Sequence, residues 1–177
     1  MVALSAQAAS IAMSTVFSHI VQKHLSQRYE NVSTDALAFV LSTVPNARAG
    51  LMRLLRSIAP SLPDLTFKTQ LSEDTSRPDM WGMDKDKAHV FLENKFWAGL
   101  TGNQPVKYLK ILSESDPEGV LLFIAPRERE DSLWRELMRR LDAEGVGVAP
   151  VEKAAGVARA AKTLVGPVIA LQSRDSL

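Results

Sequence analysis

A run of six consecutive apolar residues, Val120–Ala125, constrains the fold of this chain more than any other stretch of its sequence. The run has the length of a β-strand, and it lacks the alternation of apolar and polar residues found in strands with one face in water. It therefore predicts a strand that other elements cover on both faces of a sheet. Because a membrane-spanning helix needs about 20 apolar residues, the run predicts no membrane span.

The segments before and after this run predict an α/β fold. Residues 5–57 carry apolar side chains at helical spacing and predict three helices, the second beginning after Ser33, Thr34 and Asp35 and the third ending before Pro60. Further along the chain we expect strands at 65–71, 79–84, 88–93, 120–125, 145–151 and 168–171, and helices at 101–113, 129–141 and 153–164. Helices before, between and after the strands predict a sheet of mixed strand direction, connected by hairpins and crossovers.

The length and composition narrow the class of protein. The 177 residues fit one domain, with a helical N-terminal part at 1–60 and an α/β core at 61–177. The absence of cysteine excludes disulfides, thiol nucleophiles and Cys-ligated metals, and the N-terminus lacks the basic segment of a signal peptide, so we expect a cytoplasmic protein without a membrane partner. With a formal net charge of only +1, any phosphate-binding surface must be local.

The segment between residues 77 and 108 contains acidic and basic side chains that are candidates for metal binding and catalysis. Asp79 begins one expected strand, and Glu93 and Lys95 end the next. Because side chains alternate along a strand, Glu93 and Lys95 should share one face, and Asp79 can converge with them if the two strands are neighbours. Two carboxylates can bind Mg²⁺ or Mn²⁺ through oxygen ligands, with the lysine ammonium beside a water or a scissile phosphate.

These residues form a pattern that resembles the PD-(D/E)xK phosphodiesterase superfamily, which includes type II restriction endonucleases, Holliday-junction resolvases and many defence nucleases. The motif halves are PD at 78–79 and ENK at 93–95, and QPVKY at 104–108 is similar to the Q-xxx-Y helix of many members. The resemblance covers residues 65–126. It implies a restriction-endonuclease-like mixed sheet flanked by helices, and a Mg²⁺- or Mn²⁺-dependent nuclease that acts on nucleic acid, with DNA as the expected substrate.

The resemblance also implies a role for each motif residue. Asp79 and Glu93 would ligate the metal, and the backbone carbonyl of Asn94 would supply a further oxygen. Lys95 would orient or help deprotonate the attacking water and offset charge on the transition state. Gln104 would contact the phosphate backbone or the water network.

Three more side chains belong to the expected site. Tyr108 lies four residues beyond Gln104 on the expected helix and would support the same site. Trp97 follows Lys95 closely and would contact substrate at the mouth of the site. The stretch RYENVSTDALAFVL at 28–41 resembles the leading helix of such proteins, in which an acidic residue often joins the metal site, and the sequence does not choose between Glu30 and Asp35 for this role.

Structural interpretations stand beside these functional ones. Gln104 could cap its helix, and Tyr108 could pack in the core. The small net charge and the short chain also fit a catalytically inactive module that binds nucleic acid or a protein partner. A homodimer would suit a nuclease that cuts both strands, although no sequence feature marks an interface. Acidic residues interleave with the arginines between 127 and 140, which predicts a solvated surface there.

Overall fold

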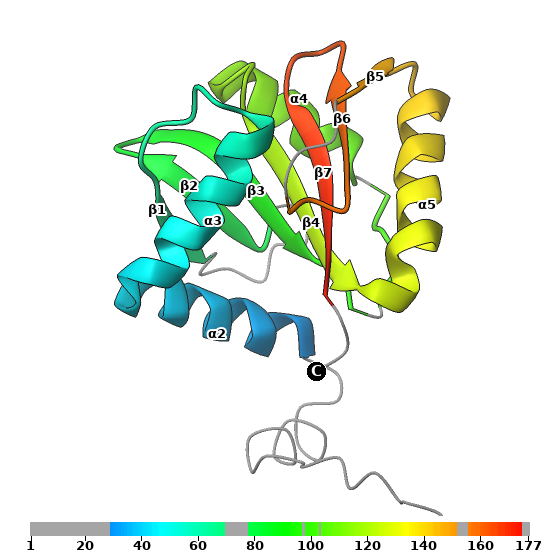
Figure 1. Ribbon diagram of the computed structural model, residues 1–177. Helices are drawn as coiled ribbons and strands as arrows, with labels where there is room; N and C mark the ends of the chain where they lie inside the picture. Colours follow the sequence, from blue (N-terminus) through cyan, green and yellow to red (C-terminus); the bar gives the residue numbers. More distant parts are fainter. Residues whose placement is uncertain (1–28, 70–77, 97, 103, 152–155, 175–177) are drawn as a thin grey trace, which may run out of the picture.

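The computed structural model describes residues 29–69, 78–96, 98–102, 104–151 and 156–174 (Figure 1). Within these residues the strands are β1 (Thr66–Thr69), β2 (Met80–Asp84), β3 (Lys87–Asn94), β4 (Val120–Pro126), β5 (Val148–Pro150), β6 (Arg159–Thr163) and β7 (Val168–Arg174). The helices are α2 (Tyr29–Thr43), α3 (Pro45–Ile58), α4 (Val106–Ser115) and α5 (Glu130–Ala143), with the 3-10 helix η1 (Arg127–Arg129) before α5. None of the described helices is long and apolar enough to cross a membrane.

The described strands form one sheet of seven in the order β1-β2-β3-β4-β7-β6-β5. β4 runs parallel to both β3 and β7, whereas the remaining neighbours are antiparallel. The connection from β2 to β3 is a hairpin, and crossovers containing α4 and α5 join the parallel strands. The predicted α/β class with a mixed sheet is therefore confirmed.

Helices cover both faces of the sheet, and the central strand β4 is buried throughout the predicted apolar run (Figure 1). Leu121 and Phe123 pack in a cluster with the leucines of α4 and α5. Leu122 and Ile124 pack in a second cluster with α3 and part of α2. Alternate residues of one strand thus enter opposite cores, which explains why the run has no polar positions.

The structure changes the predicted helical part in one respect. α2 begins at Tyr29, so Ser33, Thr34 and Asp35 lie inside the helix and the predicted N-terminal cap is wrong. Thr34 is buried, and its hydroxyl accepts a hydrogen bond from another element, so this side chain serves tertiary contact instead of capping. The first predicted helix falls at residues 1–28, outside the described residues.

Two further predictions are wrong. The helix expected at 153–164 is replaced over part of its length by β6, which pairs with β5 and β7. Alanine-rich sequence favours a helix locally, but pairing on both sides of β6 overrides that propensity. The helix expected from residue 101 begins at Val106, because the residue before a proline disfavours helical backbone and Pro105 occupies the N-cap.

Candidate functional site

The expected site lies where the start of β2 meets the end of β3. These strands are antiparallel, with Met80 opposite Leu92, so Asp79 comes next to Glu93. The backbone N–H of Asp79 donates a hydrogen bond to Glu93 Oε2 (3.3 Å). The backbone N–H of Asn94 in turn donates to Asp79 Oδ2 (2.8 Å). The two carboxylates of the sequence motif are therefore brought together.

Lys95 follows the last residue of β3 and faces the same side as Glu93, as strand alternation predicts. Its Nζ lies 2.9 Å from Glu93 Oε1, and the two side chains are only 5% and 4% exposed. The backbone N–H of Lys95 donates to the carbonyl of Ile124 in β4 (2.8 Å), which holds this position against the sheet. The ammonium is thus fixed in a buried ion pair at the end of a central strand.

Gln104 and Tyr108 complete the cluster around Glu93. Gln104 lies before α4 and not on it, so the prediction that both residues share a helix is wrong. The Nε2 group of Gln104 nevertheless donates to Glu93 Oε1 (2.6 Å) and to the hydroxyl of Tyr108 (3.1 Å). Its Oε1 accepts a hydrogen bond from the backbone N–H of Thr101 (3.3 Å), and these bonds together define the orientation of the Gln104 side-chain amide. Both residues are also buried, so each packs in the interior while it takes part in this hydrogen-bond network.

On the opposite face of the sheet, the side chain of Asn94 reaches the leading helix. Its Nδ2 group donates to the hydroxyl of Thr34 in α2 (2.7 Å), and both residues are buried. Asp35 is exposed, and Glu30 lies one helical turn before Thr34, with a side chain outside the described part of the structure. Sequence reasoning missed Thr34, although its spacing from Leu37 and Leu41 places it on the buried side of the helix.

The electrostatics of the cluster centre on Glu93. Burial raises the pKa of its carboxyl above the ordinary value, while the charge of Lys95 and hydrogen bonds from Lys95, Gln104 and the Asp79 backbone partly offset this rise. In the metal-free chain, Glu93 therefore retains its proton more readily than a glutamate exposed to water. A cation placed beside it would favour the ionised form.

The donor set fits a hard divalent cation. Among the described residues, no three or more His, Cys, Asp or Glu side chains lie close enough together to bind one metal ion. The carboxylates available at this site are therefore those of Asp79 and Glu93. Mg²⁺ needs no larger set, because it is commonly bound through one or two carboxylates and keeps several waters. Main-chain oxygens at the strand end, such as that of Asn94, can add to these ligands. Trp97, the expected contact at the mouth of the site, lies outside the described residues.

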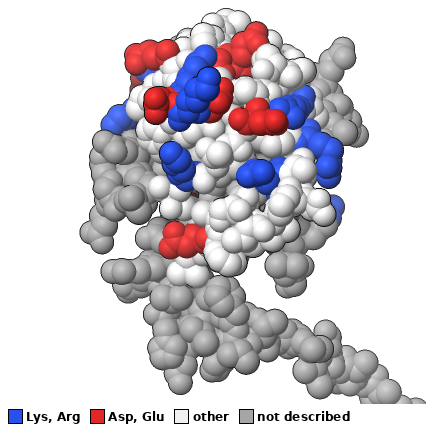
Figure 2. Space-filling view, turned by 90° about the vertical axis from the view of Figure 1, so that its left-hand side faces the viewer, with Lys and Arg blue, Asp and Glu red and all other residues white. Residues whose placement is uncertain are grey.

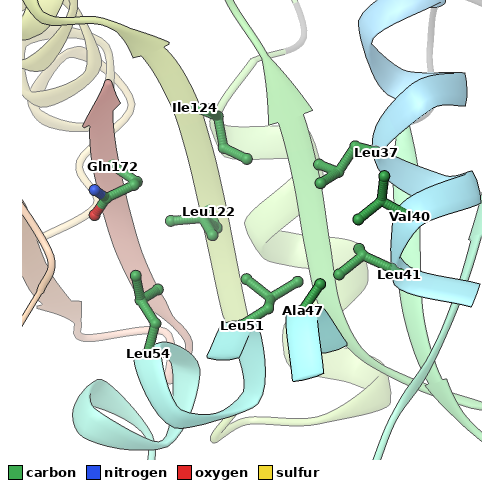
Figure 3. Close-up of a pocket in the computed structure, with 9 residues that line it drawn as sticks. All are labelled: Leu37, Val40, Leu41, Ala47, Leu51, Leu54, Leu122, Ile124 and Gln172. Atoms are coloured by element: carbon green, nitrogen blue, oxygen red, sulfur yellow. The ribbon is translucent and has the colours of Figure 1, made fainter. Parts of the chain in front are cut away.

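An apolar cavity of about 280 Å³ lies on the other face of the sheet, between the helices α2 and α3 and the strands β4 and β7 (Figure 3). Leucines from both helices line it, together with Leu122 and Ile124 of β4. Gln172 is the polar residue among the described lining, and its buried Oε1 has no hydrogen-bond partner in the described structure. The described residues of its lining include no acid or base, and the cavity lies on the face of the sheet opposite to Glu93, so it is separate from the cluster around Glu93.

Comparisons of the chain with protein-family models, with curated proteins and with solved structures found no match. Any functional assignment therefore depends on the geometry of the cluster formed by Asp79, Glu93, Lys95, Gln104 and Tyr108.

Proposed function

We propose that this protein is a Mg²⁺- or Mn²⁺-dependent nuclease of the PD-(D/E)xK kind, with a restriction-endonuclease-like fold and with DNA as its expected substrate. The observation that carries the proposal is the convergence of three motif residues from two strands. Asp79 donates through its backbone to Glu93, and the Lys95 ammonium lies 2.9 Å from the same carboxylate. The antiparallel pairing of β2 with β3 thus brings together Asp79 and Glu93, which are 14 positions apart in sequence.

Each residue then has a defined task. Asp79 and Glu93 would hold the metal ion, with the main-chain oxygen of Asn94 as a further ligand. When bound, the ion lowers the pKa of a water and neutralises charge on the phosphate. Lys95 would orient the attacking water and offset negative charge in the transition state. Gln104, through its 2.6 Å hydrogen bond, keeps the Glu93 carboxylate in one orientation, as partners of metal ligands commonly do.

A specific observation favours the second candidate, a catalytically inactive module of the same fold. The Lys95–Glu93 pair is almost completely buried, and a buried ion pair can serve structure alone. In the view of Figure 2, Lys and Arg side chains are interspersed with Asp and Glu over the described surface, in keeping with the net charge of +1. Such a surface would fit a protein partner as well as nucleic acid.

The deciding experiment combines metal binding with cleavage. The full chain is titrated with Mg²⁺ and Mn²⁺ by calorimetry and then incubated with supercoiled plasmid, linear duplex DNA, and single-stranded DNA and RNA oligonucleotides, with and without EDTA. We expect metal-dependent cleavage that falls by about 10²–10³-fold or more in Lys95→Met and Asp79→Asn. Lys110→Met and Glu114→Gln, which change exposed residues of α4, serve as matched controls with unchanged activity.

Two outcomes would contradict the nuclease proposal. Cleavage that persists undiminished in both site variants would show that these residues do not perform it. A folded wild-type chain that binds neither metal ion and cuts none of the substrates would favour the inactive binding module.

A further inference from the structure

The segment 95–104 lies between β3 and α4 and carries a partner of Glu93 at each end. Lys95 opens the segment and Gln104 closes it, and both contact the same atom, Glu93 Oε1. The backbone of this one connection therefore controls two of the contacts that orient the carboxylate.

Arg140 of α5 holds the end of the segment that bears Gln104. Its Nη1 group donates to the carbonyl oxygens of Gln104 (3.0 Å) and Thr101, and its Nη2 group donates to the carbonyl of Leu100 (2.9 Å). Glu136, one helical turn earlier, accepts from both Nη2 (2.8 Å) and Nε (3.2 Å) of the same guanidinium. A planar group with five donors can make these contacts at once, which a lysine cannot.

Arg129, the last residue of η1, holds the other end. Its Nη1 group donates to the carbonyl of Ala98 (2.9 Å) and lies 3.4 Å from the carbonyl oxygen of Lys95. The interleaved charges of this region predict a solvated surface, and Arg129 and Arg140 are indeed partly exposed. Their guanidinium groups also donate to backbone carbonyl oxygens between Lys95 and Gln104, which the charge pattern does not predict. Arg139, next to Arg140 on the same helix, is exposed.

We propose that Arg140 and Arg129 are positioning residues, which hold the backbone at Ala98, at Leu100 and Thr101 and at Gln104 so that Lys95 and Gln104 both reach Glu93. They act through backbone carbonyl oxygens and do not touch the reacting groups. The consequence for catalysis rests on the proposed nuclease function, whereas the consequence for the geometry around Glu93 can be measured without it.

The test compares Arg140→Met, which keeps the length of the side chain but removes its donors, with Arg140→Lys and with the control Arg139→Met, all in the full chain. By NMR we expect Arg140→Met to shift the side-chain amide resonance of Gln104 and to speed exchange of the Thr101 backbone amide about tenfold. In cleavage assays we expect kcat to fall about 100-fold, the loss that a misplacement of about 1 Å can cause, with a much smaller change in KM. Arg140→Lys should recover part of each effect, and Arg139→Met should match wild type.

The outcomes separate this inference from the proposed function. If Arg140→Met keeps the wild-type Gln104 resonance and the wild-type exchange of Thr101, the positioning role is overturned, whether or not the chain cuts nucleic acid. If the resonance and the exchange change as expected but wild type shows no cleavage, the positioning role stands and the nuclease proposal fails. Should Arg140→Met lose its folded NMR spectrum, Arg129→Met applies the same measurements to the other end of the segment.

Discussion

Replacing Lys95 with methionine should destabilise the metal-free chain by an amount that depends strongly on pH. The substitution leaves the Glu93 carboxylate, which is 4% exposed, without the ammonium that lies 2.9 Å away. Breaking a buried pair by removing one partner costs about 3–5 kcal/mol. Because Gln104 and the Asp79 backbone still donate to Glu93, we expect the low end of that range, about 3 kcal/mol at pH 8.

At pH 5 the same substitution should cost much less. Burial already raises the pKa of Glu93 in the wild type, where the charge and the hydrogen bond of Lys95 partly offset this rise. Removing Lys95 therefore raises the pKa of Glu93 further. The carboxyl of the variant then takes up a proton at pH 5 and no longer carries an uncompensated charge. We expect the cost to fall to about 1 kcal/mol.

Urea unfolding in EDTA, followed by tryptophan fluorescence, measures both costs. For a chain of this size, with a slope of about 2 kcal/mol/M, the midpoint at pH 8 should fall by about 1.5 M. Lys110→Met, which changes an exposed lysine of α4, should stay within about 0.5 kcal/mol of wild type. A cost under about 1 kcal/mol at pH 8, or an equal cost at both pH values, would refute the reasoning.

The double variant Glu93→Gln/Lys95→Met extends this prediction. Replacing a buried ion pair as a unit is often neutral, or stabilising by about 1–4 kcal/mol, so the double variant should recover the stability lost in Lys95→Met. It should also lose all cleavage. A double variant as unstable as the single one would show that the lysine packs and does not chiefly compensate charge.

Three further predictions concern stability. Burial raises the pKa of Glu93 in the folded chain above its unfolded value of 4.5, so protonation of this carboxyl stabilises the fold fully below pH 4.5. That stabilisation is lost as the pH rises through the folded pKa. In urea titrations the metal-free wild type should therefore lose stability over this pH window relative to the double variant. Asn94→Ala removes the 2.7 Å hydrogen bond to Thr34 and should cost about 1–2 kcal/mol in urea unfolding, and a cost near zero would show that the bond does not help to hold α2 on the sheet. Gly166→Ala should cost about 1–3 kcal/mol in thermal unfolding, because φ is +120° and the added Cβ would lie 2.8 Å from the Pro117 carbonyl oxygen, and an unchanged melting temperature would contradict this.

Features that depend on local periodicity could be predicted from the amino-acid sequence. The unbroken run Val120–Ala125 identified the doubly covered central strand, because a strand with both faces buried has no place for polar residues. Alternation along β3 likewise put Glu93 and Lys95 on one face, since the side-chain period of a strand is two. The two strands of the β2–β3 hairpin, and with them the meeting of Asp79 and Glu93, followed from the same kind of pattern.

Features that depend on partners distant in sequence became visible only in the folded chain. Residues 159–163 form a strand and not a helix because β5 and β7 pair with both of their edges. Thr34 meets Asn94 across 60 positions of sequence, and Arg140 reaches the Gln104 carbonyl across 36. Local propensities and spacings do not predict such contacts, because the same polar residue in a helix can face water or can hydrogen-bond to a buried amide or carbonyl group.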